Sequence, residues 1–143
     1  MKVEGTYTFA APPDLVWGRL QDPEALRTCI PGCRDLVGDG PDRWKATLSV
    51  GAGPIRGVYN GTVAIRDKQE PVSYTLDVEG TGSPGFVRGS ARVTLAAAGG
   101  GTVVTVDADG QVGGTVAAVG QRMVTGVARM LMGQFFSCLA ASL

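Results

Sequence analysis

The sequence closes with residues 113–143, GGTVAAVGQRMVTGVARMLMGQFFSCLAASL, the only long stretch of the chain with an uninterrupted helical pattern. At about 100° per residue, polar side chains such as Arg122 and Arg129 fall opposite an apolar stripe. The stripe consists of Ala117, Gly120, Val124, Val127, Ala128, Leu131, Phe135, Cys138 and Leu139. We therefore predict one long amphipathic helix, with small side chains in its first half and bulky side chains in its second half.

The beginning of the chain predicts one strand and two short helices. Residues 2–9 alternate between apolar and polar side chains, as expected for a strand with one wet face. Pro-Pro-Asp at 12–14 and Asp-Pro at 22–23 each begin a short helix, because proline suits the first helical turn and aspartate suits its positive end. Pro31 and Gly32 then stop the second helix.

From Arg34 onward the apolar side chains repeat with period two, which predicts strands joined by turns rich in glycine and proline. The predicted strands lie at 34–38, 44–50, 57–65, 74–78, 87–95 and 104–112. Together with residues 2–9 they predict a seven-stranded, curved antiparallel sheet wrapped around the C-terminal helix. We expect an α+β fold in a single domain, residues 1–143.

Composition excludes several classes of function. Thirteen basic and thirteen acidic residues give a formal net charge of zero, and no basic run suggests binding to nucleic acid. The chain contains no histidine, which removes the usual general base, and its three cysteines are too few ligands for a zinc site. We expect no metal, no cofactor and no enzymatic activity, and a cytoplasmic protein whose cysteines stay reduced.

Small residues are frequent at inward-facing strand positions: Gly57, Gly61, Gly89, Ala91, Ala108 and Gly110. One interpretation is geometric, because glycine lets a coiled sheet bend and lets a helix approach it. The other is an apolar cavity between sheet and helix. Its predicted wall is Trp44, Leu48, Tyr59, Tyr74, Leu76, Val87, Ala91, Gly120, Met123, Val124 and Val127. The aromatic members are equally typical of an ordinary core.

Two surface features follow from the same pattern. The glycine-rich turns at 51–54, 82–85 and 110–114 share one end of the predicted sheet with the start of the helix, so we interpret this end as a mouth. Val119, Met130, Met132 and Phe136 lie off the buried stripe. They predict a contact of the helix with a second copy, an enzyme partner or a membrane surface.

Four motifs in this order resemble those of a known family: Ile30-Pro31-Gly32-Cys33, the segment 50–57 with Gly61, Gly85-x-x-x-Gly89 with Ala91, and Gly113-Gly114-x-x-Ala117-x-x-Gly120-x-Arg122. The order of elements is similar to the helix-grip fold of the START, polyketide cyclase and birch-pollen-allergen superfamily. Within that superfamily the motifs resemble the CoxG family of carbon monoxide dehydrogenase subunits, and the resemblance covers nearly the whole chain.

The resemblance implies a non-catalytic accessory protein of molybdenum hydroxylases of the carbon monoxide dehydrogenase type. It also implies a hydrophobic ligand, for which we hypothesise an isoprenoid quinone or a similar lipid that the protein carries or presents. Longer relatives continue beyond the final helix, and the inner membrane surface and a homodimer are further expected contacts. Two alternatives remain, namely an assembly factor with a filled core and an enzyme similar to the cyclases and hydrolases of the superfamily.

Overall fold

The computed structural model describes residues 1–51 and 53–143, so Ala52 of the predicted turn lies outside the described residues. The elements are β1 (Lys2–Phe9), α1 (Pro13–Gln21), α2 (Pro23–Cys29), β2 (Cys33–Gly38), β3 (Arg43–Val50), the 3-10 helix η1 (Gly53–Ile55), β4 (Gly57–Gln69), β5 (Ser73–Gly82), β6 (Gly85–Ala98), β7 (Gly101–Gly114), α3 (Thr115–Ala118) and α4 (Gln121–Ala141). The predicted α+β fold is confirmed.

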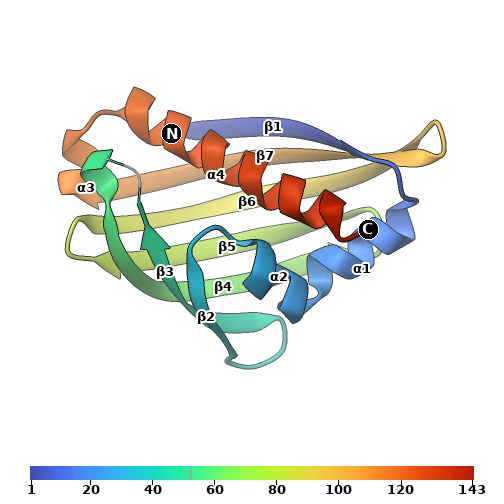
Figure 1. Ribbon diagram of the computed structural model, residues 1–143, viewed down its shortest axis with the longest axis horizontal. Helices are drawn as coiled ribbons and strands as arrows, with labels where there is room; N and C mark the ends of the chain where they lie inside the picture. Colours follow the sequence, from blue (N-terminus) through green and yellow to red (C-terminus); the bar gives the residue numbers. More distant parts are fainter. Residues whose placement is uncertain (52) are drawn as a thin grey trace.

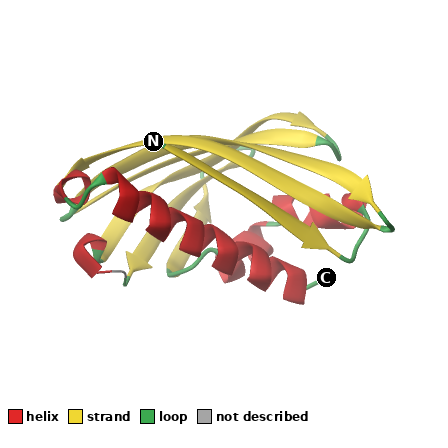
Figure 2. Cartoon of the chain, turned by 90° about the horizontal axis from the view of Figure 1, so that it is seen from above, coloured by secondary structure: helices red, strands yellow, loops and turns green. Residues whose placement is uncertain are grey.

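The seven strands form one antiparallel sheet in the order β1-β7-β6-β5-β4-β3-β2 (Figure 1). The chain therefore runs as a meander from β2 to β7, and β1 pairs beside β7, with Phe9 opposite Thr102. Figure 2 shows the sheet arching over α4, which lies along its concave side. Inward-facing residues of neighbouring strands stand in register, as Leu76, Ala91 and Ala108 do across β5, β6 and β7.

The two short helices begin where the prolines predict. Pro13 and Pro23 each stand at the first helical position, and the Asp22 side chain accepts a hydrogen bond from the Glu24 backbone N–H at 3.0 Å. Val16, Trp17 and Leu20 bury one face of α1 against the sheet. The two helices therefore close the far end of the domain, opposite the glycine-rich turns, with the C-terminus beside α1 (Figure 1).

The final helical pattern is broken, which corrects the prediction of one uninterrupted helix. α3 ends at Ala118 and α4 begins at Gln121, with Gly120 between them at φ 94° and ψ 147°. That backbone conformation is accessible essentially to glycine alone. The break changes the rotational phase of the helix, so Val116 is buried in place of Ala117.

The interior divides into two apolar clusters. The main cluster lies at the far end and contains Trp17, Trp44, Tyr74, Phe136 and Leu139 among its buried residues. The second cluster lies at the glycine-rich end and consists of Ile55, Tyr59, Val116 and Val124 with partly buried residues around them. α4 joins the two clusters, because Val124 near its start and Leu139 near its end are both buried.

Phe136 corrects a second detail of the sequence prediction, which placed this side chain on the outer face. It is buried in the main cluster, where its ring stacks on Tyr7 with centroids 4.2 Å apart. The reason is that α4 lies closest to β1 at the edge of the sheet, so its buried face is rotated toward Tyr7 and Phe9. Met132 is also partly buried against the main cluster.

A disulfide joins Cys29 at the end of α2 to Cys138 in α4, which corrects the expectation that the cysteines stay reduced. Their Cα atoms are 5.3 Å apart, a separation typical of disulfides. The pairing could not be read from the sequence because the two cysteines are 109 positions apart and the docking of α4 beside α2 brings them together. Cys33 remains a free, partly buried thiol.

By length and composition alone, α4 is a candidate membrane span, with a mean hydropathy of 1.3. A core helix of a globular domain meets the same two criteria. In this chain Phe136 and Leu139 of α4 are buried in the main cluster and Cys138 is bonded to α2. α4 is therefore an integral part of the domain, although only 17% of its most apolar window is buried.

Candidate functional site

On β5, β6 and β7, the burial of inward side chains decreases toward the glycine-rich end. On β6, Leu95 and Val93 are buried, whereas Ala91, Gly89 and Val87 are partly exposed. The same change occurs on β5 between Tyr74 and Leu76, and on β7 between Val106 and Ala108. Solvent therefore reaches apolar side chains that face the helix. We call the partly exposed inward positions from Leu76, Ala91 and Ala108 onward the open half of the concave face.

The helix opposite the open half is also incompletely buried. Val127, Ala128 and Leu131 of α4 are partly exposed, although all three belong to the predicted apolar stripe. Val127 packs against the second cluster, and the buried anchors of α4 are Val124, Phe136 and Leu139. The middle of α4 therefore spans the open half between two anchored ends.

The glycine-rich end, which we interpreted as a mouth, is occupied by the second cluster. Val116 of α3 is 1% exposed and lies beside Ile55 of η1, and the Tyr59 hydroxyl donates a hydrogen bond to the Ile55 carbonyl oxygen at 2.7 Å. The Val116 backbone N–H donates to the Pro84 carbonyl oxygen at 2.9 Å. α3, η1 and the β5–β6 turn thus form a small apolar plug.

Of the predicted wall residues, most lie on the concave side. Trp44 and Tyr74 are buried in the main cluster, with Leu76 and Ala91 partly buried against it. Tyr59 and Val124 are buried in the second cluster, with Val87 and Val127 partly buried against it. Leu48 is partly buried on β3. The sheet and α4 thus bring nine of the predicted residues to one side of the sheet, eight of them in or against the two clusters and Leu48 beside them: Trp44, Leu48, Tyr59, Tyr74, Leu76, Val87, Ala91, Val124 and Val127.

Gly120 and Met123 do not join them, which corrects this part of the prediction. Met123 is 48% exposed, and a side chain added at Gly120 would have no atom within 4 Å. The cause is the break between α3 and α4, which turns both residues toward solvent. Sequence reasoning missed Ile55 and Val116 of the plug, and the only signal for them was their position beside glycine-rich turns.

The inward-facing glycines bear on both interpretations of the sequence, a bent sheet and an apolar cavity. At Gly61 a Cβ atom would collide with the Glu79 carbonyl oxygen of the neighbouring strand, so glycine there permits a close approach of β4 and β5. At Gly89 the nearest atom, the Asp109 carbonyl oxygen, would lie 3.1 Å from the Cβ. The bend of the sheet explains Gly61, whereas the partial exposure around Ala91 needs a separate explanation.

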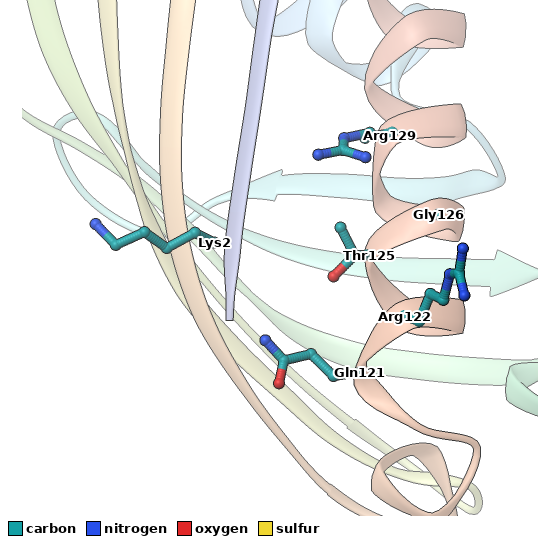
Figure 3. Close-up of a pocket in the computed structure, with 6 residues that line it drawn as sticks. All are labelled: Lys2, Gln121, Arg122, Thr125, Gly126 and Arg129. Atoms are coloured by element: carbon teal, nitrogen blue, oxygen red, sulfur yellow. The ribbon is translucent and has the colours of Figure 1, made fainter.

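Two grooves lie outside the concave face. One, of about 640 Å³, runs between the start of β1 and the first half of α4 and is lined by Lys2, Gln121, Arg122, Thr125, Gly126 and Arg129 (Figure 3). In Figure 3 the Lys2 and Arg122 side chains point away from each other, so the cations do not converge on one point. The other groove, of about 620 Å³, lies over the outer face of the sheet near Asp77 and Arg88. Neither groove includes a predicted wall residue.

Three tyrosines on the concave face have phenols that stay protonated. Burial raises the pKa of Tyr59 and Tyr74 above the ordinary value, and burial also raises the pKa of Tyr7. Within residues 1–51 and 53–143, no group of three or more His, Cys, Asp or Glu side chains is placed to hold a metal ion. The concave face therefore offers apolar contact and few polar groups.

A family profile for the carbon monoxide dehydrogenase subunit CoxG matches residues 5–143. The chain belongs to this family. The match confirms the resemblance that the four motifs indicated, and it associates the chain with carbon monoxide dehydrogenase. None of the curated proteins matches the sequence.

Solved structures show the same fold. The chain is 35% identical to a conserved protein from Geobacillus kaustophilus, with a TM-score of 0.96, and the match covers 99% of this chain and 94% of that chain. A START superfamily protein from Mycobacterium smegmatis has a TM-score of 0.73 at 17% identity, and the match covers 99% and 95% of the two chains. The CoxG chain described here therefore has a START-like fold.

Proposed function

We propose that this CoxG protein is a non-catalytic accessory protein that binds a hydrophobic molecule over the open half of the concave face. The main supporting observation is that burial decreases along β5, β6 and β7 toward the glycine-rich end, where apolar side chains facing α4 remain partly exposed. Covering such surface with an apolar ligand is favourable by about 25 cal/mol for each Å² of apolar area removed from water. The ligand class that we propose is an isoprenoid quinone or a similar lipid.

The chemistry of the open half supports an apolar ligand. Leu76, Val78 and Val87 face inward and carry no hydrogen-bonding group, while the Tyr59 hydroxyl already donates to Ile55. Ligand pockets are typically apolar with a few polar groups that fix orientation. A quinone has a long hydrocarbon tail and only two carbonyl acceptors, which fits such a surface.

Membership of the CoxG family supports the proposed destination of the ligand. The enzyme partner would be a molybdenum hydroxylase of the carbon monoxide dehydrogenase type, to which the protein carries or presents the molecule. Such enzymes must pass electrons toward the respiratory chain, and a quinone accepts them. We propose a cytoplasmic location, at the periphery of the inner membrane when the ligand is collected.

The proposed lack of catalysis rests on the side chains at hand. The chain has no histidine, and on the described part of the concave strands every inward side chain is apolar or a tyrosine, apart from the Cys33 thiol and Thr102 at the buried end. The Thr102 hydroxyl donates to the Ala11 carbonyl oxygen at 2.7 Å, so it serves a structural role. A general acid and base pair would require titratable groups near the ligand.

The test is mass spectrometry of an organic extract of the protein purified from its native host, together with thermal shifts on adding quinones. We expect a stoichiometric quinone or lipid and a rise in melting temperature, because a ligand that binds only the folded state stabilises it. Repeated extracts without such a molecule, and no thermal shift, would contradict the proposal.

A matched pair of variants locates the site. Ala91→Leu adds a large side chain in the open half, whereas Ala97→Leu adds the same side chain at an exposed position of the same strand. We expect Ala91→Leu to remove quinone binding and Ala97→Leu to retain it, with both proteins folded. If Ala91→Leu unfolds the protein, the region was already filled, and the assembly-factor alternative is favoured.

The outer face of α4 favours a contact surface in addition to the ligand site. Met123 and Met130 are 48% and 46% exposed, and from Gly110 to Leu143 the chain carries two arginines and no acidic residue. This face is where we place the contact with the enzyme partner, the membrane surface or a second copy. Flotation with anionic vesicles and sedimentation of the protein alone distinguish the last two.

A further inference from the structure

The attachment of α4 to the rest of the domain is concentrated at its two ends. Val124 is buried near the start of the helix, and Phe136 and Leu139 are buried near its end. Between them, Val127, Ala128 and Leu131 are partly exposed above the open half of the concave face. α4 therefore crosses the open half of the concave face, and its position depends on the contacts at its two ends.

The N-terminal end of α4 is built as a pivot. Gly120 precedes the helix in a backbone conformation that is essentially reserved for glycine, and no atom lies within 4 Å of the place where its Cβ would be. α3, on the other side of Gly120, is fixed by Val116 and by the Thr115 hydroxyl, which donates to the Pro84 carbonyl oxygen. Rotation about Gly120 would therefore move α4 and leave α3 in place.

The C-terminal end of α4 is held by a covalent bond. Cys138 is bonded to Cys29, and α2, which carries Cys29, is anchored in the core through Ala25 and Leu26. An exposed hydrogen bond from the Arg19 Nε atom to the Ser142 hydroxyl, at 3.2 Å, adds a polar contact at this end. Cys138 is partly exposed, whereas Cys29 is 4% exposed, so Cys138 is the more accessible residue of the pair.

We propose that the Cys29–Cys138 disulfide is a redox latch that holds α4 across the concave face, and that its reduction leaves the C-terminal end held by the burial of Phe136 and Leu139, so that α4 swings about Gly120 more often and opens the apolar interior. The consequence for ligand exchange rests on the proposed function. In a reducing compartment a disulfide of this kind is typically a redox-sensing one rather than a permanent one.

The chemistry of the latch is thiol–disulfide exchange with a dithiol reductant. One thiolate of the reductant attacks Sγ of Cys138, the bond between the two cysteines breaks, and Cys29 leaves as a thiolate that takes up a proton. The second thiol of the reductant then attacks the mixed disulfide and releases Cys138 as a thiol. The protein gains two electrons and two protons, and the reductant leaves as its own disulfide.

Cys33 provides the matched control. It is a free, partly buried thiol only four residues from Cys29, and its Sγ donates to the Asp35 carbonyl oxygen at 3.4 Å. Burial raises the pKa of the Cys33 thiol, so its reactive thiolate is scarce near neutral pH. Cys33→Ser should leave the latch and its redox response intact, whereas Cys29→Ser and Cys138→Ser remove the latch.

The test compares oxidised protein with protein reduced by dithiothreitol, using hydrogen exchange read by mass spectrometry and binding of the apolar dye ANS. Reduction should accelerate exchange in residues 130–141 by about tenfold or more and increase ANS fluorescence, with exchange in β6 and β7 near the main cluster unchanged. Cys33→Ser should respond in the same way. Equal exchange in the two redox states, or a response of Cys33→Ser unlike that of the unsubstituted protein, would overturn the latch.

Two further outcomes separate the latch from the proposed function. Cys138→Ser, or Cys29→Ser if that variant folds better, should match the reduced protein with and without dithiothreitol. A short-chain ubiquinone analogue should then bind faster to the reduced protein than to the oxidised protein. Equal binding rates despite different exchange would overturn the gating of the ligand. No quinone binding in either state, with the redox-dependent exchange preserved, would overturn the proposed function and support the latch.

Discussion

The two ends of the concave face differ in how completely they are filled, although one sheet and one helix form both. At the far end, α1 and α2 add a second layer, and Trp17 meets the Tyr74 ring edge-on with centroids 5.4 Å apart. At the glycine-rich end, the described residues form a smaller buried cluster of Ile55 in η1, Tyr59 in β4, Val116 in α3 and Val124 in α4. The difference shows that helices outside the sheet, rather than the sheet itself, decide where this fold is packed and where it stays open.

The largest expected effect of a single substitution is at the filled end. Phe136→Ala removes a buried ring that stacks on Tyr7, and we expect the free energy of unfolding to fall by about 3–5 kcal/mol. Met130→Ala, on the exposed face of the same helix, should change it by less than about 0.5 kcal/mol. Urea denaturation measures both. Similar values for the two variants would mean that the filled end is not the stabilising half.

The disulfide joins α4 to the filled end, so its loss should have the second largest effect on the free energy of unfolding. Cys138→Ser should lower the free energy of unfolding by about 2–4 kcal/mol, because a closed loop of this length restricts the unfolded chain. Unsubstituted protein in dithiothreitol should unfold at the same urea concentration as the variant. Cys33→Ser serves as the control, and a loss of stability as large as that of Cys138→Ser would argue against the Cys29–Cys138 pairing.

A substitution at Gly120 tests the proposed pivot at the glycine-rich end. Gly120→Ala forces alanine into a conformation that costs about 1–3 kcal/mol, without any clash to add to that cost. Gly133→Ala, in the middle of α4 and also without an atom within 4 Å, should instead stabilise the protein by about 0.4–1 kcal/mol. Opposite signs in thermal unfolding are the expected result. If both substitutions stabilise, α3 and α4 form one continuous helix after all.

A substitution at Val116 tests whether the plug at the glycine-rich end contributes less to the free energy of unfolding than the filled end does. Val116→Ala removes two methyl groups from a fully buried site, at about 0.8 kcal/mol each, so a loss of about 1–2 kcal/mol is expected. Val58→Ala, at a 39% exposed valine near the same end, should have almost no effect. A loss at Val116 as large as that at Phe136 would make the two ends energetically equal.

The smallest expected effect lies on the outer face of the sheet and depends on pH. The Arg66 guanidinium, which donates to Asp77 at 2.6 Å, and the Ser90 hydroxyl lower the pKa of the Asp77 carboxyl. The unfolded chain therefore binds this proton more readily, so the stabilisation is complete above about pH 4 and is lost as the pH falls through the lower, folded pKa. The pair is exposed, so the contribution is below about 1 kcal/mol.

Asp77→Asn should therefore flatten the decline of the urea midpoint between about pH 5 and pH 2 and leave the midpoint at pH 7 nearly unchanged. Midpoints measured at several pH values check this. An unaltered decline would assign the acid sensitivity to other carboxylates.

Much of the fold could be predicted from local patterns. The alternation of side chains placed Leu76, Ala91 and Val87 on the inward face, and the structure agrees at each of these positions. The proline and aspartate signals at 12–14 and 22–23 predicted both short helices. These patterns are reliable because the period of side-chain direction is a property of the strand or helix itself.

The candidate site was predicted less completely. Nine of the eleven proposed wall residues lie on the concave side, but Gly120 and Met123 do not. Their assignment assumed that one helical period continues through Gly120, and a break of the helix alters the facing of the residues beside it. The glycine-rich turns indicated the correct end of the sheet but not the plug that Val116 and Ile55 form there.

The sequence by itself determined the order of the elements, the inward face of each strand and the membership of the CoxG family, because all three are encoded in short-range patterns. Only the tertiary structure decided that Cys29 meets Cys138, that Phe136 turns inward against Tyr7, and that the open half lies between two anchored ends of α4. The physical reason is that these contacts join segments about a hundred residues apart, and their partners are chosen by how the curved sheet and the last helix pack.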